Sequence, residues 1–333
     1  MQDDLLNFSE PRANVRANGE VELGEEVGCD GSTKKPIHVV THAHADHMGG
    51  LTTGGRLVAT PETLDLLAAL GKLKHKNPLG LAYGKPLQLK DGTLTLFKAN
   101  HILGAAQVMV ETKEGSMAFT GDFKFKGTRV LHPDELVIEA TYGRPEQRRN
   151  YTDVDLLLVD LVETALQKGP VEVMASNGKL QEVLALLAQL PRGIPIIVDS
   201  KGYALARVYE KYGVRLPEYL EASTERALRA VRDKAYVALW PLNARHASRT
   251  TTVLVTGRSM KPFERLKDNL YLVGLSDHSD FDDLVLYVHE SHPRIVITDA
   301  YRSPSASILA KELQERLGIR ALARPQVGSG NMG

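Results

Sequence analysis

The chain has 333 residues, of which 43% are hydrophobic and 25% charged, enough to bury the core of one large domain or two smaller ones. It carries 41 basic and 41 acidic residues, so its overall charge does not point to a nucleic-acid partner. Cys29 is the only cysteine, which excludes an intrachain disulfide and a thiolate zinc cluster. The acidic N-terminus lacks the apolar run of a signal peptide, and no stretch is long and apolar enough to span a bilayer. We therefore expect a cytoplasmic protein without a membrane partner.

The first half of the chain, from Val21 to about Tyr142, predicts short strands separated by turns. Its β-branched and aromatic runs are flanked by Gly, Asp or Asn, as strands usually are. These runs cover residues 36–40, 56–60, 94–98, 106–111, 116–120 and 136–140. One predicted helix interrupts them at 59–70, with Thr60 as its N-cap, Pro61 at its first position and Gly71 at its end.

After residue 144 the pattern changes to strands that alternate with amphipathic helices, which is typical of a parallel α/β unit. The predicted helices cover 154–168, 178–190, 204–213 and 225–234, and the predicted strands cover 171–176, 195–200 and 251–257. From Asn269 the chain returns to strand–helix units that end near Leu317. We therefore expect a strand-rich first half, an α/β middle section and a short final piece.

The most informative motif is the sequence T-H-A-H-A-D-H at residues 41–47, which directly follows a predicted strand. Its alternating side chains can direct His42 and His44 to one side and Asp46 and His47 to another. Imidazole nitrogens and carboxylate oxygens are ligands that zinc and manganese accept. By chance this spacing occurs in fewer than roughly one in a thousand chains of this size. Four ligands so close together cannot all hold one tetrahedral ion, so we expect two adjacent metals.

Two later residues are candidates to complete the metal site. His101 follows the predicted strand 94–98, and Asp122 follows the predicted strand 116–120. Each lies just past a strand end, where an active site at a sheet edge collects its residues. Alone, each would more often be an ordinary loop or turn residue. Together with the first motif, both are predicted to be ligands.

These residues resemble a known fold in their order and spacing. Asp30, the H-x-H-x-D-H run, His101 and Asp122 match the metallo-β-lactamase fold. The stretches H-I-L-G-A-A, E-A-T-Y-G and L-S-D-H-S-D further resemble its β-CASP nuclease branch, above all ligase-associated DNA exonucleases and mRNA 3′-end processing factor-like exonucleases. The resemblance implies an α/β protein in which a metallo-β-lactamase αββα sandwich, residues 1–143 and 270–333, carries an inserted α/β β-CASP cap domain at 144–269.

The resemblance also implies two divalent metal ions, with zinc as the family's usual metal and manganese as the alternative. By this resemblance the ligands are His42, His44 and His101 for one ion, Asp46 and His47 for the other, and Asp122 as a bridge between them. Asp30 would orient ligands without binding metal itself. The two ions would share a hydroxide and clamp the scissile phosphate, which places Asp46 among the catalytic residues.

Three further positions correspond to the β-CASP motifs. Glu139 matches the first motif and His278 the second; in the family the carboxylate orients the imidazole, which donates a proton to the departing oxygen. A helix-capping loop histidine near Asp280 is the less favoured interpretation of His278. In the third motif, Asp299 stands where the ribonucleases and bacterial exonucleases carry a histidine that binds the second metal. Asp299 is predicted to be a ligand; the alternative is a strand-end aspartate beside a weakly held second metal.

We therefore expect a metal-dependent nuclease that hydrolyses phosphodiester bonds of single-stranded nucleic acid, acting as an exonuclease. The alternatives are an RNA-processing endo- or exoribonuclease, a hydrolase of small esters, and a scaffold without activity. Ser176 and Lys179 open a predicted helix and are weak candidates for phosphate contacts, against the default of a plain helix N-terminus. The sequence leaves open DNA versus RNA, the polarity of digestion and a homodimer.

Overall fold

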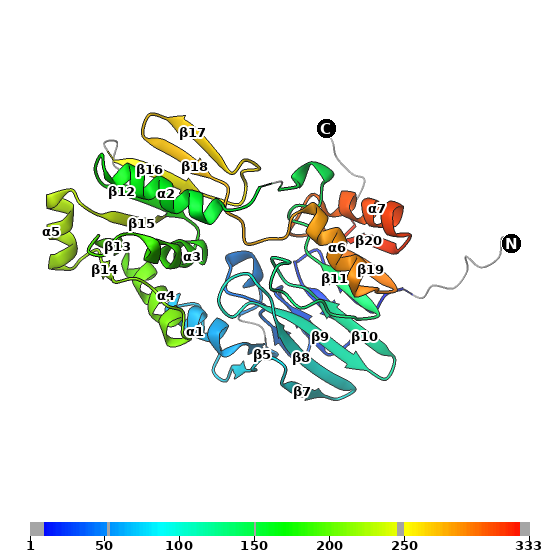
Figure 1. Ribbon diagram of the computed structural model, residues 1–333. Helices are drawn as coiled ribbons and strands as arrows, with labels where there is room; N and C mark the ends of the chain where they lie inside the picture. Colours follow the sequence, from blue (N-terminus) through cyan, green and yellow to red (C-terminus); the bar gives the residue numbers. More distant parts are fainter. Residues whose placement is uncertain (1–9, 52–53, 150, 245–249, 327–333) are drawn as a thin grey trace, which may run out of the picture. The chain divides into compact units, whose positions relative to one another are not determined.

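The computed structural model describes residues 10–51, 54–149, 151–244 and 250–326 (Figure 1). The chain forms two compact units. The first comprises residues 1–61, 74–146 and 279–333, and the second comprises 62–73 and 147–278. The sequence predicts the insertion at 144–269, whereas the second unit begins at 147, extends to 278 and also takes in 62–73.

One of the two sheets in the first unit is built from the N-terminal strands. In spatial order it contains β1 (Ala13–Val15), β2 (Val21–Leu23), β3 (Val27–Cys29), β4 (Ile37–Val39), β5 (Arg56–Ala59) and β6 (Leu79–Gly80). The first three strands are antiparallel neighbours, and the pairs from β3 to β6 are parallel. We call this sheet A.

The other sheet of the first unit, sheet B, combines strands from both ends of that unit. In spatial order it contains β20 (Arg320–Arg324), β19 (Ile295–Asp299), β11 (Glu135–Ile138), β10 (Gly115–Phe119), β9 (Ala106–Thr112), β8 (Gly92–Lys98) and β7 (Pro86–Leu89). Helix α7 (Ala306–Leu317) packs on β19 and β20, and α6 (Phe281–Ser291) packs beside α7 (Figure 1). Val39 and Val58 of sheet A share one buried core with Leu94, Val108 and Phe119 of sheet B. The two sheets therefore pack face to face.

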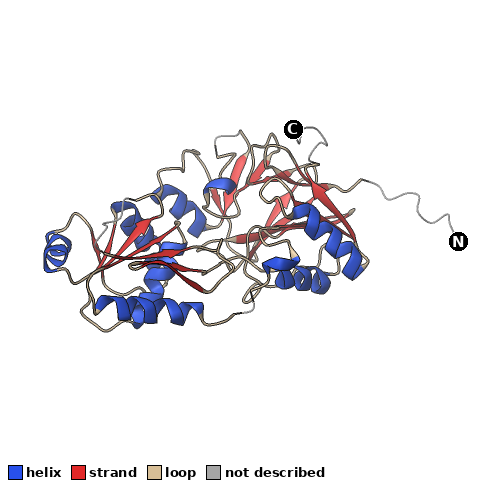
Figure 2. Ribbon diagram, turned by 90° about the horizontal axis from the view of Figure 1, so that it is seen from above, coloured by secondary structure: helices blue, strands red, loops and turns tan. Residues whose placement is uncertain are grey.

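The second unit is built around one largely parallel sheet. Its strand order is β14 (Tyr219–Glu221), β13 (Ile196–Val198), β15 (Val237–Pro241), β12 (Val171–Ala175), β16 (Thr251–Val255), β18 (Leu270–Val273) and β17 (Phe263–Lys267), and only the β17–β18 pair is antiparallel among these described strands. Helices lie on both sides of this sheet (Figure 2). They are α1 (Pro61–Ala69), α2 (Val154–Leu166), α3 (Lys179–Leu186), α4 (Ser200–Lys211) and α5 (Glu225–Asp233).

The predicted α/β class is confirmed, and every predicted helix is present within a few residues of its predicted bounds. Strands β1 to β3, β6, β7, β14, β15, β17 and β20 lie outside the runs that the sequence predicts, because most are only two to four residues long or lack clear turn residues at their ends. The finer description as an αββα sandwich with a cap stays a prediction. In the described part of the chain, no helix is both long and apolar enough to cross a membrane.

Candidate metal centre

The predicted site residues lie where strands of the first unit end. Strands β8, β10, β11 and β19 run in the same direction, since β8 and β10 are both antiparallel to β9 and the others are parallel neighbours. Their carboxyl ends therefore meet at one edge of sheet B. The residues at or just beyond these ends are His101, Asp122, Glu139 and Asp299. The motif after β4 in sheet A reaches the same region, because the carbonyl of Thr41 accepts a hydrogen bond of 3.0 Å from the N–H of Ala106, the first residue of β9.

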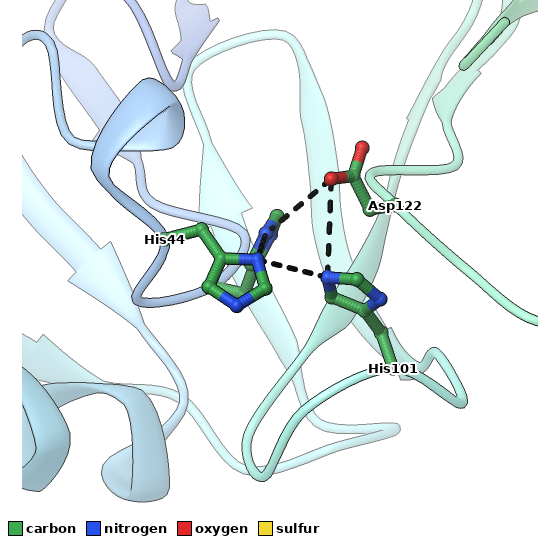
Figure 3. A group of neighbouring side chains, drawn as sticks. His44, His101 and Asp122 are labelled. Atoms are coloured by element: carbon green, nitrogen blue, oxygen red, sulfur yellow. Dashed lines mark hydrogen bonds and ion pairs between the residues drawn. The ribbon is translucent and has the colours of Figure 1, made fainter. Parts of the chain in front are cut away.

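Three histidines and one aspartate form a compact group of ligand atoms. The group consists of His42, His44, His101 and Asp122, and one atom of each lies within 4.8 Å of the others. Figure 3 shows His44, His101 and Asp122 pointing toward a common centre. His44 Nδ1 is 3.1 Å from His42 Nε2 and 3.0 Å from His101 Nε2. Asp122 Oδ2 is 3.6 Å from His42 Nε2 and 3.8 Å from His101 Nε2.

These separations fit one metal ion. With Zn–N bonds of about 2.0–2.1 Å, a tetrahedral zinc ion requires its donor atoms to lie about 3.4 Å apart. The four distances above, from 3.0 to 3.8 Å, bracket that value. Neutral imidazoles and a carboxylate are also the chemical donor set that zinc accepts.

His47 forms a second group of donor atoms beside Asp122. Its Nε2 lies 3.2 Å from Asp122 Oδ2 and 3.7 Å from Asp46 Oδ2. His47 is fully buried, and among the described residues its Nε2 makes ion-pair contacts with these two carboxylates but no hydrogen bond of good geometry. A buried polar atom without a hydrogen bond is costly, and a metal ion would supply the missing interaction. His47 thus lies close to both carboxylates, and a second ion held by Asp46, His47 and Asp122, with Asp122 common to both positions, stays a prediction.

Asp30 fixes the loop that carries the predicted ligands at residues 42–47. Its Oδ2 lies 2.6 Å from His47 Nδ1 and accepts a hydrogen bond of 2.7 Å from the hydroxyl of Thr41, while its Oδ1 accepts from the N–H of Thr41 at 2.8 Å. Asp30 has a positive φ of 60°, a conformation that Asp adopts more readily than most residues. Because Asp30 accepts at Nδ1, the lone pair of His47 is left on Nε2, which faces Asp46 and Asp122.

The electrostatics of the two buried histidines differ. Burial, reinforced by the nearby His47 and His101, lowers the pKa of His42 well below its ordinary value, so this ring is neutral at pH 7. Burial also lowers the pKa of His47, but the carboxylates of Asp122 and Asp30 outweigh burial and raise the pKa to about 10. A metal ion on Nε2 of His47 would take the place of that proton.

Glu139 is buried on the segment that follows β11. Its Oε1 accepts a hydrogen bond of 2.8 Å from the N–H of Phe123, the residue next to Asp122. The carbonyl of Phe123 accepts hydrogen bonds from the N–H of Ser279, at 2.6 Å, and from its hydroxyl, at 2.9 Å. His278 immediately precedes Ser279 and is the last residue of the second unit. The pairing of Glu139 with His278 stays a prediction.

In the second unit, the segment before His278 is tied to the start of α3. Lys179 Nζ lies 2.6 Å from Glu182 Oε2 and 3.3 Å from Asp277 Oδ2. Burial lowers the pKa of Lys179, but Asp277 and Glu182 outweigh it and raise the pKa above its ordinary value. The sequence predicts a substrate contact for this lysine, whereas the structure places its ammonium between two carboxylates, with 3% of the residue exposed.

Ser176, the other predicted phosphate contact, is exposed and lies just before α3. The helix begins after Gly178, whose N–H donates a hydrogen bond of 2.8 Å to the side chain of Gln181. One N–H at this helix start is therefore already satisfied within the chain. A role for Ser176 in binding substrate stays a prediction.

Asp299 ends β19 and is buried, but its carboxylate has other partners. Its Oδ2 accepts a hydrogen bond of 2.7 Å from Arg302 Nη1, and its Oδ1 accepts from the N–H of Tyr301 at 3.0 Å. Its role as a metal ligand stays a prediction.

The residues that sequence reasoning missed are Thr41 and Arg302. Thr41 stands directly before His42 in the motif, and the spacing of three between Asp299 and Arg302 is a signal that usually marks only a surface pair.

Several known proteins are similar to this chain in sequence. An uncharacterized protein in the lig 3′ region of Acidianus ambivalens is 40% identical over 140 residues, which cover 41% of this chain and all of that protein. A protein of Opitutus terrae named probable DNA ligase is 31% identical over 325 residues, covering 88% of this chain and 30% of that protein. The transcription termination factor FttA of Pyrococcus horikoshii is 30% identical, covering 55% of this chain and 34% of the factor.

Other comparisons concern more distant relatives and the fold. The RNase aCSPSF2 of Saccharolobus solfataricus is 26% identical, covering 51% of this chain and 42% of that protein. A crystal structure of a protein of unknown function from Enterococcus faecalis has a TM-score of 0.64 at 12% identity and covers 94% of this chain and 96% of that one. No family model matches the chain. This chain thus spans about a third of the length of the probable DNA ligase and of FttA.

A cluster of histidines and carboxylates at the edge of a two-sheet α/β unit could hold a divalent metal ion. The site and the relatives agree on one group of proteins. The chain belongs to the β-CASP nuclease branch of the metallo-β-lactamase superfamily.

Proposed function

We propose that this chain is a phosphodiesterase that uses two divalent ions to hydrolyse single-stranded nucleic acid from an end. The observation that carries the proposal is the convergence of His42, His44, His101 and Asp122, with the buried Nε2 of His47 3.2 Å from Asp122 Oδ2. Zinc is the metal that this donor set favours, with manganese as the alternative. In the proposed architecture, the first unit is a metallo-β-lactamase αββα sandwich and the second is a β-CASP cap.

The chain's own residues have distinct tasks in this proposal. Bound divalent ions supply a nucleophile at neutral pH and neutralise charge on the scissile phosphate. Asp30 keeps His47 in the tautomer whose Nε2 can bind metal, through its contact of 2.6 Å with Nδ1. The buried site residues His42 and His47 exclude water from one side of the reacting group.

The leaving group needs a proton, and His278 is proposed to donate it from a ring N–H. Histidine suits this task because its ordinary pKa lies near neutral pH. Glu139, which accepts the N–H of Phe123 beside Asp122, is proposed to orient that imidazole. His278 is joined by one peptide bond to Ser279, which is itself hydrogen-bonded to the carbonyl of Phe123.

The substrate class is proposed from the relatives. Two relatives are named for a DNA ligase or its genetic neighbourhood, and two others are named as a transcription termination factor and an RNase. Both DNA and RNA strands are therefore substrates to test. The chemistry of the site is the same for both, because the scissile group is a phosphodiester in each.

A gel assay on end-labelled single-stranded DNA and a matched RNA tests the proposal. Each strand is incubated with Zn²⁺, with Mn²⁺ and with chelator, using wild type and Asp46→Ala. We expect metal-dependent shortening from one end that the variant does not show, while circular dichroism shows that the variant is folded. Cleavage of neither strand by a metal-loaded wild type would refute the nuclease proposal and favour hydrolysis of a small ester.

A further inference from the structure

At the third β-CASP position the chain has Asp299, where the resemblance leads us to expect a histidine. The structure shows which groups contact this aspartate. Asp299 is 1% exposed. Its Oδ2 accepts a hydrogen bond of 2.7 Å from Arg302 Nη1, and its Oδ1 accepts from the N–H groups of Tyr301 and Arg302 at 3.0 and 3.2 Å. Both carboxylate oxygens therefore already have donors within the chain.

Arg302 is itself a buried residue with fixed partners. Its side chain is 9% exposed, and its Nη2 donates hydrogen bonds to the carbonyls of Gly19, at 2.9 Å, and Asp46, at 3.3 Å. Burial lowers the pKa of Arg302, but the carboxylates of Asp299 and Asp30 outweigh burial and raise the pKa above its ordinary value. The guanidinium is therefore a permanent positive charge beside the loop that carries Asp46 and His47.

The turn between β1 and β2, which contains Gly19, packs against Tyr301 beside Arg302. Gly19 has a φ of +81°, and a Cβ at this position would lie 2.4 Å from Cε1 of Tyr301. The Tyr301 ring therefore packs directly on the glycine, and the guanidinium carbon of Arg302 lies 5.5 Å from the centre of the same ring. Three segments of the first unit thus hold Arg302 in place.

A metal ion and a guanidinium compete for the same carboxylate. An aspartate paired with a buried arginine has its negative charge neutralised, which weakens its attraction for a cation. Breaking the pair to release the carboxylate would leave a buried guanidinium unpaired, which is strongly unfavourable.

We propose that Arg302 withholds Asp299 from metal coordination, so that the metal position formed by Asp46, His47 and Asp122 binds its ion more weakly than the position formed by the three histidines. The inference rests on the proposed metal site. It makes Arg302 a residue that sets the difference in affinity between the two positions.

The test measures metal affinity rather than activity. Zn²⁺ and Mn²⁺ are titrated into metal-free wild type, Arg302→Gln and Arg302→Lys, in competition with a chromophoric chelator. Wild type should show one tight and one weak ion per chain. Arg302→Gln should tighten the weak ion by about tenfold or more, because Asp299 becomes free to bind it, and leave the tight ion unchanged. Arg302→Lys keeps a positive charge beside Asp299 but not the guanidinium contacts, so it should tighten the weak ion less than Arg302→Gln does.

Two further variants isolate the cause. In the double variant Asp299→Asn/Arg302→Gln the gain should disappear, because the released carboxylate is removed. Arg294→Gln removes a comparable guanidinium, which pairs with Asp134 at 3.2 Å on the exposed side of the unit, and should leave both affinities unchanged.

An unchanged or weaker second ion in Arg302→Gln would overturn the inference. If that variant does not fold, Asp299→His decides instead. Its imidazole does not pair with a guanidinium and should tighten the weak ion, and an unchanged affinity would count against the inference. Asp46→Asn serves as the reference for the metal site itself. If it binds both ions as wild type does, the proposed ligand assignment fails regardless of the result for Arg302.

Discussion

Asp30 illustrates how a buried carboxylate can orient a predicted metal ligand without being a ligand itself. It contacts His47 Nδ1 at 2.6 Å and both the hydroxyl and the N–H of Thr41. These contacts fix a loop in which neighbouring side chains must point to different metal positions. The role depends on both oxygens being acceptors, since all three partners approach the carboxylate as donors.

Asp30→Asn should therefore weaken metal binding by about 10–100-fold. The amide has one acceptor oxygen and one donor nitrogen, so it cannot accept both at the Oδ2 position, from His47 and the Thr41 hydroxyl, and at the Oδ1 position, from the Thr41 N–H. Chelator competition measures the affinity. Asp134→Asn is the matched control, because Asp134 accepts from Ser116 near the start of β10, at the opposite end of that strand from Asp122. Equal metal affinity in Asp30→Asn and wild type would contradict this role for Asp30.

His278→Ala should lower kcat by about 10²–10⁴-fold, the usual contribution of a general acid, and change KM much less. The defect should shrink on a nitrophenyl ester of thymidine monophosphate, because nitrophenolate leaves without a proton. The exposed His289→Ala provides the control. A rise in KM with unchanged kcat would assign His278 to substrate binding instead.

A short sequence motif can predict site residues only when the residues that act together lie close together in the chain. The H-x-H-x-D-H spacing predicts His42, His44, Asp46 and His47 as neighbours, and the structure places the three histidines beside Asp122 and Asp46 beside His47. The partners of Arg302 could not be predicted in this way. Arg302 acts on residues about 256 and 283 positions away in the chain, and no periodicity carries that information.

At the scale of elements, α1 shows how contacts can assign a helix to a unit that its place in the sequence does not suggest. Asp65 of α1 accepts hydrogen bonds of 2.6 Å from Lys211 Nζ and from the hydroxyl of Tyr212. Both partners lie at the end of α4, within the second unit. The sequence predicts the helix correctly from Pro61 and Gly71, but it places the helix in the first domain.

Asp65→Asn should destabilise the second unit at neutral pH. Burial raises the pKa of Asp65, but the hydrogen bonds from Lys211 and Tyr212 outweigh it and keep the pKa below the ordinary value of 3.8. A lowered carboxyl pKa adds stability above the unfolded-state pKa, and that stability is lost as the pH falls through the folded-state pKa.

Thermal unfolding from pH 7 to pH 2.5 measures this effect. The difference in melting temperature between wild type and Asp65→Asn should be positive at pH 7 and should disappear at the acidic end. Glu225→Gln, which removes an exposed partner of Arg229, should show little difference at any pH. A difference between wild type and Asp65→Asn that does not depend on pH would show that Asp65 acts through packing rather than charge.

At the scale of the whole molecule, the two units contain different spectroscopic and metal-binding features. The histidine–carboxylate cluster lies in the first unit, whereas the chain's single tryptophan, Trp240, lies on β15 in the second. Trp240 packs beside a buried cluster that includes Tyr236 and Ala238. Its fluorescence therefore reports on the second unit alone.

Metal should stabilise the first unit selectively. At a free concentration of 100 times the Kd, one bound ion adds about 2.7 kcal/mol to the free energy of unfolding. In urea, the transition followed by circular dichroism should shift to higher concentration with metal, and the Trp240 fluorescence transition should shift less. Equal shifts of both signals would show that the two units unfold as one.

The overall architecture was predictable where the sequence has clear periodicity. The alternation of helices and strands after residue 144 predicts the parallel sheet of the second unit, and the structure contains it. The three-residue strands β1 to β3 could not be predicted, since they are too short to show alternation. The boundaries of the units also depend on long-range contacts, which is why 62–73 and 270–278 join the second unit.

The most direct test of the account compares phosphodiester cleavage by Asp122→Asn, Asp134→Asn and wild type on one end-labelled single strand at saturating metal. Asp122 is common to both proposed metal positions, so its loss should remove several kcal/mol of transition-state stabilisation, a decrease in rate of about a thousandfold or more. Asp134→Asn should cleave at the wild-type rate. Wild-type cleavage by folded Asp122→Asn would show that the hydrolytic site lies elsewhere.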